Sequence, residues 1–198
     1  MYIPNIISVI RLFLAPFVIW LIISQNMLGA FVVFLIAGLT DALDGFIARR
    51  FHLKTELGAY LDPIADKALL MSTYIALGLT PLHIANPGTP IDYYLPTWLV
   101  ILVVSRDMLI IGAFMLSWLM GREVEVKPLI ISKLNTLMQI ATAVLVLGAH
   151  GLNLDLNAYI VPTIWITGAT TALSAVAYLV TWLRYMASYD INNNTRAP

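Results

Sequence analysis

The chain has 198 residues, of which 60% are hydrophobic and 11% are charged, and its mean hydropathy is +0.86. Because a soluble globular domain carries roughly twice that share of charged residues, the composition indicates an integral membrane protein. The net charge is zero and no basic run is present, which argues against a nucleic-acid partner. The absence of Cys excludes disulfides, thiolate metal sites and a cysteine nucleophile.

Six apolar stretches follow one another along the chain, separated by polar or Gly- and Pro-containing breaks. A helix crosses the hydrocarbon layer with about 20 apolar residues, so each stretch is long enough for one span. The first stretch has no small-residue cleavage site after it, and we expect a retained helix. The sequence therefore predicts an all-α bundle of six transmembrane helices, with one domain over residues 1–188 and a polar tail over 189–198. The six stretches cover residues 5–24, 29–50, 57–80, 95–120, 129–149 and 159–186.

Lys and Arg gather on one side of this predicted bundle. The loops on the other side carry only Asp92 and Asp155 as charged residues. Since cytoplasmic loops hold the positive charge, we expect both termini to be cytoplasmic. The cations on that side are Arg11, Arg49, Arg50, Lys54, Lys67, Arg122, Lys127, Lys133, Arg184 and Arg196.

Four aspartates form the most informative cluster. Asp41 and Asp44 lie in the second predicted helix, and Asp62 and Asp66 lie in the third. Spacings of three and four place each pair on one helical face. The short loop between these helices predicts antiparallel packing, which would bring all four carboxylates to one depth on the cytoplasmic side. Ionisable residues inside a membrane are rare and usually functional.

Four carboxylates at one place repel one another unless some are protonated or divalent cations bridge them. Hard oxygen ligands suit Mg²⁺, Mn²⁺ or Ca²⁺, and we favour the cations over protonation. Gly45, Ala48 and Gly58 lie on or beside the acidic faces and permit close approach, either of a neighbouring helix or of a phosphate. Arg49 supplies a cation for a diphosphate, although it would also serve as a membrane-surface anchor. Two metals with an Arg suit phosphoryl transfer.

The stretch DALDGFIARRFHLKTELGAYLDPIADK, residues 41–67, carries a resemblance. It matches the signature D-x2-D-G-x2-A-R-x8-G-x3-D-x3-D of the CDP-alcohol phosphatidyltransferase family at every fixed position. The rest of the chain also resembles that family. The resemblance implies a homodimer, a two-metal site for Mg²⁺ or Mn²⁺, and Asp66 as the general base. The implied metal ligands are Asp41, Asp44, Asp62 and Asp66, and the implied CDP-binding residues are Asn5, Arg11, Gly45, Ala48, Arg49 and Gly58.

The activity expected from this resemblance is transfer of a phosphatidyl group from CDP-diacylglycerol to an alcohol at a cytoplasm-facing site. A proton or ion transporter would use intramembrane acids as a relay, but it predicts acids spread across the bilayer rather than gathered on one side. A helix bundle that binds lipid without chemistry leaves the complete signature unexplained. Loss of CMP release on metal chelation would separate the transferase from both.

The acceptor alcohol depends on residues 105–139. This segment resembles the CMP-forming cardiolipin synthases of the family, whereas phosphatidylglycerolphosphate synthases more often have a second Lys where Asn135 stands. A phosphate monoester carries about −1.5 to −2 charges and needs more cations than a phosphodiester. We therefore expect phosphatidylglycerol as the acceptor, with glycerol 3-phosphate as the alternative. Arg106, Lys133 and Asn135 are the predicted acceptor-binding residues, although Lys133 would also serve as an interface lysine.

Arg106 lies near the middle of the fourth predicted span, where an unpaired charge is costly. Asp107 is its neighbour in sequence, and neighbours in a helix do not face each other. We therefore expect Arg106 to face a cavity rather than to pair with Asp107, with an interhelical salt bridge as the alternative.

Overall fold

The computed structural model describes residues 3–51, 56–80, 95–119 and 130–194. Within these ranges, side chains are described for residues 10–40, 67–80, 95–119 apart from Phe114 and Trp118, and 130–186. These ranges contain α-helices and no strand, which confirms the predicted all-α bundle of six helices. The helices are α1 (Ile3–Ile23), α2 (Met27–Phe51), α3 (Glu56–Leu79), α4 (Thr97–Leu119), α5 (Ile130–Leu152) and α6 (Asn157–Asn194).

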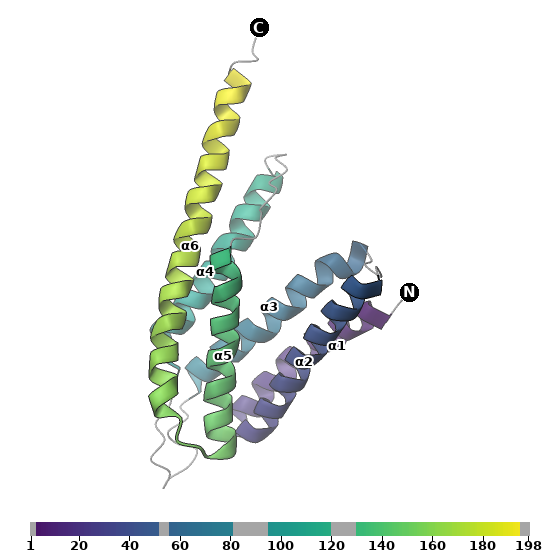
Figure 1. Ribbon diagram of the computed structural model, residues 1–198, viewed down its shortest axis with the longest axis vertical. Coiled ribbons are helices and arrows are strands. Elements are labelled where there is room, and N and C mark those ends of the chain that lie inside the picture. Colours follow the sequence, from purple (N-terminus) through teal and green to yellow (C-terminus); the bar gives the residue numbers. More distant parts are fainter. Residues whose placement is uncertain (1–2, 52–55, 81–94, 120–129, 195–198) are drawn as a thin grey trace.

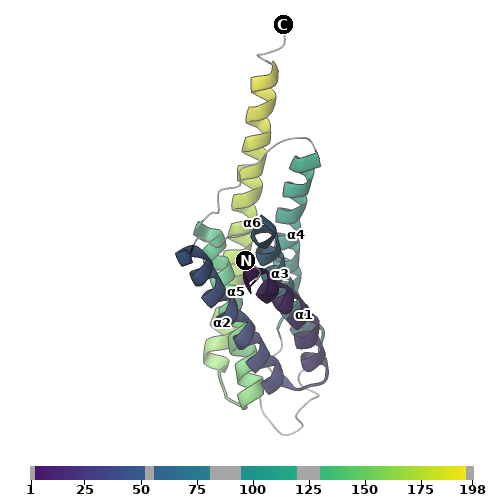
Figure 2. The same ribbon diagram turned by 90° about the vertical axis from the view of Figure 1, so that its right-hand side faces the viewer.

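The last helix is longer than the sequence predicted. The apolar stretch ends near residue 186, but α6 continues to Asn194. Residues 187–194 contain neither Gly nor Pro, so nothing in them interrupts the helical hydrogen bonds. The polar tail expected from residue 189 therefore begins inside α6, and that end of the helix projects beyond the rest of the bundle (Figure 2).

Among the helical segments whose side chains the structure describes, three are long and apolar enough to cross a membrane: Thr97–Ser117, Ile130–Leu152 and Asn157–Met186. Shorter apolar segments of α1, α2 and α3 accompany them, over Ile10–Ile23, Met27–Thr40 and Lys67–Leu79. Large hydrophobic side chains cover the outside of all six helices, and Phe13, Leu79 and Leu119 are among those at least 72% exposed. An apolar outer surface of this extent fits a multi-pass membrane protein.

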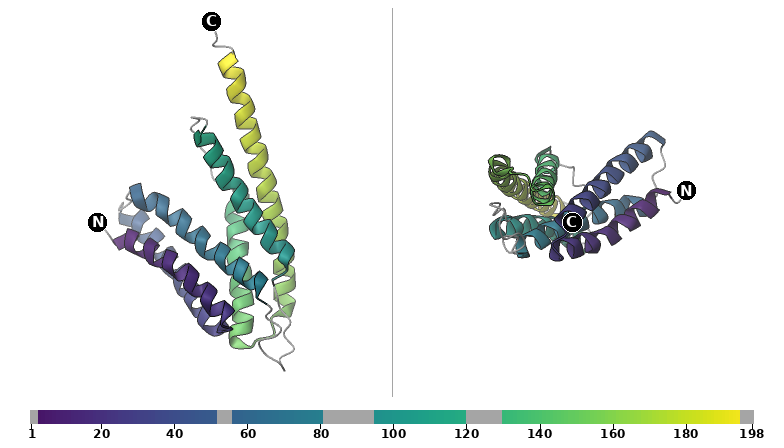
Figure 3. Two further views of the ribbon diagram at one scale, coloured as in Figure 1. Left: turned by 180° about the vertical axis from the view of Figure 1, so that it is seen from behind. Right: turned by 90° about the horizontal axis from the view of Figure 1, so that it is seen from below.

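The helices meet at one end of the molecule and spread apart at the other (Figures 1 and 3). α1 packs against α2 and α3, and α6 packs against α4 and α5. Contacts between α2 and α5 join the two groups, and α3 adds contacts to α4 and α5. The turns between α1 and α2 and between α5 and α6 lie at the narrow end, so the termini lie at the opposite, spread end.

Polar side chains fix the turns at the narrow end. The backbone N–H of Gly29 donates to Asn26 Oδ1 at 3.0 Å and caps the start of α2. Asn153 has a φ of 53°, the left-handed conformation that often ends a helix, and it follows α5 directly. The backbone N–H of Asn157 donates to Asp155 Oδ1 at 3.2 Å at the start of α6.

Close helix packing at this end depends on Gly151. A Cβ atom at Gly151 would lie 2.9 Å from Leu28 Cα and 3.0 Å from the Met27 carbonyl oxygen. These are backbone atoms, so neither can rotate away. Gly151 therefore sets how closely α5 approaches the start of α2, as small residues do in membrane helix pairs.

Candidate active site

A cavity of about 300 Å³ lies among the first five helices. Its wall is mostly apolar, and its charged side chains are Arg11 from α1, Lys67 from α3 and Asp107 from α4. The polar residues Thr136 and Gln139 come from α5. The remaining lining residues are Phe34, Ala37, Gly38, Leu69, Leu70 and Ile140.

The four aspartates of the signature belong to two of the helices that line this cavity. Asp41 and Asp44 lie in α2, four and seven residues after the lining residue Ala37. Asp66 and Asp62 lie in α3, four residues before Leu70 and seven before Leu69. These spacings of four and seven match the helical repeat, so we expect the four aspartates on the faces of α2 and α3 that line the cavity. The side chains of these four aspartates are not among the described ones. The close approach of their carboxylates therefore stays a prediction.

Most of the predicted CDP-binding residues also have side chains outside the described ones. Arg11 is described: it is buried in α1 and lines the cavity. The side chains of Asn5, Gly45, Ala48, Arg49 and Gly58 lie outside the described residues. Among the described side chains, no group of three or more His, Cys, Asp or Glu residues could hold a metal ion. The chemistry of the four aspartates nevertheless suits hard divalent cations, because carboxylates are the ligands that Mg²⁺ and Mn²⁺ prefer.

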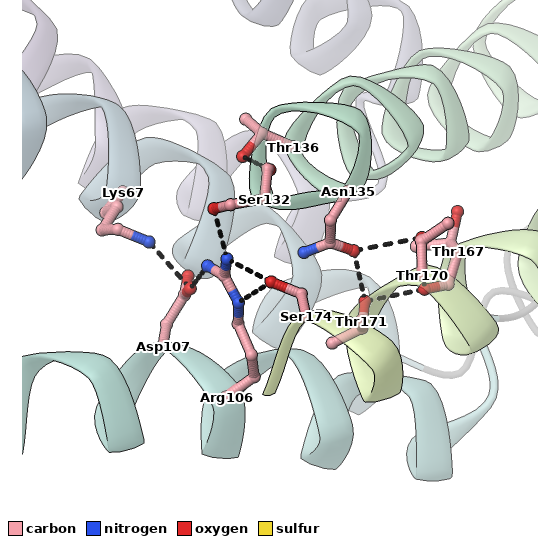
Figure 4. Close-up of polar contacts among 10 residues, drawn as sticks. All are labelled: Lys67, Arg106, Asp107, Ser132, Asn135, Thr136, Thr167, Thr170, Thr171 and Ser174. Carbon is pink, nitrogen blue, oxygen red and sulfur yellow. Dashed lines mark hydrogen bonds and ion pairs between the residues drawn. The ribbon is translucent and has the colours of Figure 1, made fainter. Parts of the chain in front are cut away.

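Asp107 joins two cations at the edge of the cavity. Its Oδ1 accepts from Lys67 Nζ at 2.7 Å and from Arg106 Nη1 at 2.6 Å (Figure 4). The Asp107 and Arg106 side chains are 5% and 2% exposed, whereas Lys67 is 37% exposed. One nearly buried carboxylate therefore pairs with two cations, a buried guanidinium on its own helix and a partly exposed ammonium on α3.

The expectation that Arg106 would not pair with Asp107 is wrong. Adjacent Cβ atoms do diverge on a helix, but the guanidinium lies at the end of a long side chain and reaches back to the neighbouring carboxylate. The burial of Arg106 between helices makes this pairing favourable, because an ion in an apolar interior needs a counter-ion.

Arg106 is also bound by two other helices. Its Nη2 donates to Ser132 Oγ of α5 at 2.6 Å and to Ser174 Oγ of α6 at 2.7 Å, and its Nε donates to Ser174 Oγ at 3.2 Å. The guanidinium carbon lies 5.5 Å from the centre of the Tyr178 ring. Arg106 therefore ties α4 to α5 and α6, and it is not among the residues that line the cavity.

Asn135 and Lys133, the other predicted acceptor-binding residues, lie on different faces of α5. Asn135 is fully buried, and its Oδ1 accepts from Thr171 at 2.7 Å and from Thr170 at 3.2 Å (Figure 4). Lys133 is exposed. Neither lines the cavity, so the structure does not bring these two residues and Arg106 together there. Their contact with an acceptor stays a prediction.

Gln139 was not predicted as a site residue, although it belongs to the segment 105–139 on which the acceptor prediction rests. It lines the cavity and is 1% exposed. The sequence signal that draws attention to it is an amide in the middle of an apolar helix, because such groups require hydrogen-bond partners.

Comparison with known proteins gives a consistent match. The family model for CDP-alcohol phosphatidyltransferase matches residues 1–187. The chain is 34% identical to CDP-diacylglycerol–glycerol-3-phosphate 3-phosphatidyltransferase 1, chloroplastic, of Oryza sativa subsp. japonica, over 88% of this chain and 55% of that protein. It is also 34% identical to cardiolipin synthase (CMP-forming) of Rattus norvegicus, over 89% of this chain and 60% of that protein.

A third relative is similar in length. The chain is 30% identical to CDP-diacylglycerol–glycerol-3-phosphate 3-phosphatidyltransferase of Aquifex aeolicus, over 93% of this chain and 94% of that protein. The chain spans little more than half the length of the rice and rat relatives. Relatives named for two different reactions match at the same 34% identity, so overall similarity does not choose between those reactions.

Proposed function

Because the chain belongs to the CDP-alcohol phosphatidyltransferase family, we propose that it transfers a phosphatidyl group from CDP-diacylglycerol to the hydroxyl group of an alcohol, releasing CMP. The observation that carries this proposal is the complete eight-residue signature on α2 and α3, the helices that also line the cavity. Family membership favours this chemistry over the transporter and over a lipid-binding bundle without activity.

In the proposed reaction, the acceptor hydroxyl gives its proton to Asp66. The oxygen then attacks the β-phosphorus of CDP-diacylglycerol, and the bond between that phosphorus and the CMP oxygen breaks. CMP leaves with the electron pair of the broken bond, and no covalent intermediate with the protein is needed. Asn5, Arg11, Gly45, Ala48, Arg49 and Gly58 are the proposed contacts of the CDP group.

Asp41, Asp44, Asp62 and Asp66 would hold two divalent cations, Mg²⁺ or Mn²⁺. Such ions supply positive charge for the diphosphate of the donor. The described cations add to this charge, because Arg11 and Lys67 both line the cavity.

For the acceptor, we propose phosphatidylglycerol, which would give cardiolipin. Phe34, Leu69, Leu70 and Ile140 provide an apolar wall beside the charged residues of the cavity. A lipid acceptor gains from apolar contacts near its head group, whereas the water-soluble glycerol 3-phosphate gains little from them. The rat relative carries the corresponding name. Glycerol 3-phosphate is the second candidate, because the rice and Aquifex relatives are named for it.

We further propose that both termini and the active site face the cytoplasm and that the protein is a homodimer. We infer the cytoplasmic side from the positions of Lys and Arg, since the loops predicted for the other side carry only Asp92 and Asp155 as charged residues. The dimer follows from the family resemblance.

The experiment that tests the proposed function offers each acceptor separately. Purified protein receives CDP-diacylglycerol with Mg²⁺ or Mn²⁺ and either phosphatidylglycerol or glycerol 3-phosphate, and the lipid product is identified by mass. We expect cardiolipin from the first mixture. Phosphatidylglycerolphosphate from the second mixture alone would select the second candidate, and no new lipid from either would refute the proposed transfer to these acceptors.

A further inference from the structure

The side chain of Gln139 provides hydrogen-bond donors that no described residue uses. Its Nε2 is buried and has no hydrogen-bond partner among the described residues. Gln139 nevertheless lines the cavity, where a ligand could reach it. A buried amide without a partner is costly, so buried polar groups are nearly always satisfied by protein, water or ligand.

The backbone of Gln139 is bound by a side chain of α3. The hydroxyl of Tyr74 on α3 donates to the Gln139 carbonyl oxygen at 3.0 Å, and Tyr74 is fully buried. This bond ties α5 to α3, the helix that also carries Lys67 and two of the signature aspartates. The backbone of Gln139 is therefore held at a defined place relative to the proposed catalytic helix.

Thr136 extends the polar surface that Gln139 begins. The two are three positions apart in sequence, so both lie on one face of α5, and both line the cavity. The Thr136 hydroxyl donates to the Ser132 carbonyl oxygen at 3.1 Å, which leaves the hydroxyl oxygen able to accept. This part of the wall thus offers both a donor and an acceptor.

Asn135 provides an informative contrast. It is also a buried amide of α5 with an Nδ2 that lacks a partner among the described residues. Its oxygen, however, is occupied by Thr170 and Thr171 of α6, and it does not line the cavity. Of these two amides, Gln139 is the one placed to meet a ligand inside the cavity.

A ligand beside Gln139 must bring an oxygen acceptor for its N–H donor, and negative charge suits a cavity whose lining includes Arg11 and Lys67. A phosphorylated glycerol group has both. We propose that Gln139 is a specificity-determining residue whose amide donates to a phosphate or hydroxyl oxygen of the glycerol-phosphate group of the acceptor. This inference rests on the proposed function and names a residue for acceptor recognition that the signature does not include.

The test compares Gln139→Leu with Thr142→Val. The first variant removes the amide donor at similar volume, and the second removes a buried hydroxyl of the same helix that bonds to Thr167 and does not line the cavity. We expect Gln139→Leu to lower kcat/KM for the acceptor by roughly 10- to 100-fold, the usual effect of one lost hydrogen bond to a charged group. KM for CDP-diacylglycerol should change by less than about twofold, and Thr142→Val should change neither constant by more than that. An unchanged acceptor constant, or equal losses for donor and acceptor, would overturn the proposal.

Gln139→Met keeps the length of the side chain but removes the donor without adding a charge, so it covers the case in which Gln139→Leu fails to fold. We expect the same decrease in kcat/KM for the acceptor, with little change in KM for CDP-diacylglycerol. Phosphatidylglycerol and glycerol 3-phosphate are tested in separate arms, and the arm with the larger loss identifies the source of the glycerol-phosphate group.

A binding measurement separates this inference from the proposed reaction. Glycerol 3-phosphate and short-chain phosphatidylglycerol are added separately to the full chain in detergent, and the rise in Tm is recorded. We expect one of them to raise the Tm of the wild type and of Thr142→Val more than that of either Gln139 variant, even if no transfer is detected. Equal shifts in all four proteins, or no shift in any, would overturn the role of Gln139, whatever the transfer assay shows.

Discussion

Removing the Asp107 carboxylate should destabilise the protein more than any other change at the edge of the cavity. Asp107→Ala leaves Arg106, only 2% exposed, without the carboxylate that its Nη1 contacts at 2.6 Å. Breaking a buried ion pair by removing one partner costs about 3–5 kcal/mol. The two serines and the Tyr178 ring still contact Arg106, so we expect the lower end, about 3 kcal/mol. For a chain of this size, such a loss lowers Tm by roughly 6–12 °C.

Lys67→Met is the matched control for this prediction. It removes the other cation bound to the same carboxylate oxygen, but Lys67 is 37% exposed and its pair with Asp107 is partly solvated. Exposed ion pairs contribute about 0–1 kcal/mol, so this variant should lose at most a few degrees. Thermal unfolding of both variants in the same detergent, followed by tryptophan fluorescence, gives the comparison. The reasoning fails if Asp107→Ala loses no more stability than Lys67→Met.

Other variants test separate parts of the account. Asp62→Asn should abolish CMP release while the protein stays folded, because it removes a proposed ligand of the metal site; substantial turnover at saturating metal would contradict the assignment. Asp66→Asn should lower kcat far more than it weakens binding of CDP-diacylglycerol, since a general base acts mainly in the transition state; equal losses would make Asp66 a metal ligand only. Gly151→Ala should cost about 1–3 kcal/mol in thermal unfolding, because the new Cβ would meet Leu28 Cα at 2.9 Å, and an unchanged Tm would show that the helices can separate freely. Asn135→Lys should shift the ratio of kcat/KM toward glycerol 3-phosphate if this residue reads the acceptor charge, and an unchanged ratio would remove it from acceptor recognition.

The helices could be predicted from sequence because each apolar stretch is long enough for a span and ends at polar or Gly- and Pro-containing segments. The predicted boundaries differ from the observed ones by a few residues at most ends, with α6 as the exception. Its last turns are polar, and hydrophobicity measures which residues enter a membrane rather than where the helical hydrogen bonds stop. The helix therefore extends beyond the apolar stretch.

The composition of the site could be predicted only in part. The apolar stretches predicted the helices α2 and α3 that contain the aspartates of the signature. Their spacings of three and four predicted that each pair shares a helical face. The same reasoning could not foresee the partners of Arg106. Its contacts to Ser132 and Ser174 join helices distant in sequence, and their approach depends on packing of the whole bundle.

The surroundings of Gln139 also depend on helix packing that the sequence does not show. The sequence shows an amide within an apolar helix, but whether it faces lipid, another helix or a cavity depends on how α5 is rotated against α2 and α3. Asn135 lies one helical turn earlier and has the same functional group, yet its oxygen is bound by threonines of α6. Only the packed structure distinguishes the two positions.

The most direct test of the central claim is CMP release by the purified protein as divalent metal is removed and restored. The reaction contains CDP-diacylglycerol and phosphatidylglycerol, and CMP and lipid product are both quantified. We predict one cardiolipin per CMP, loss of both products with a chelator, and recovery of both on adding Mg²⁺ or Mn²⁺ to the wild type but not to Asp62→Asn. CMP release that persists in the chelator, or that occurs equally in Asp62→Asn, would contradict a metal-dependent transferase built on the four aspartates.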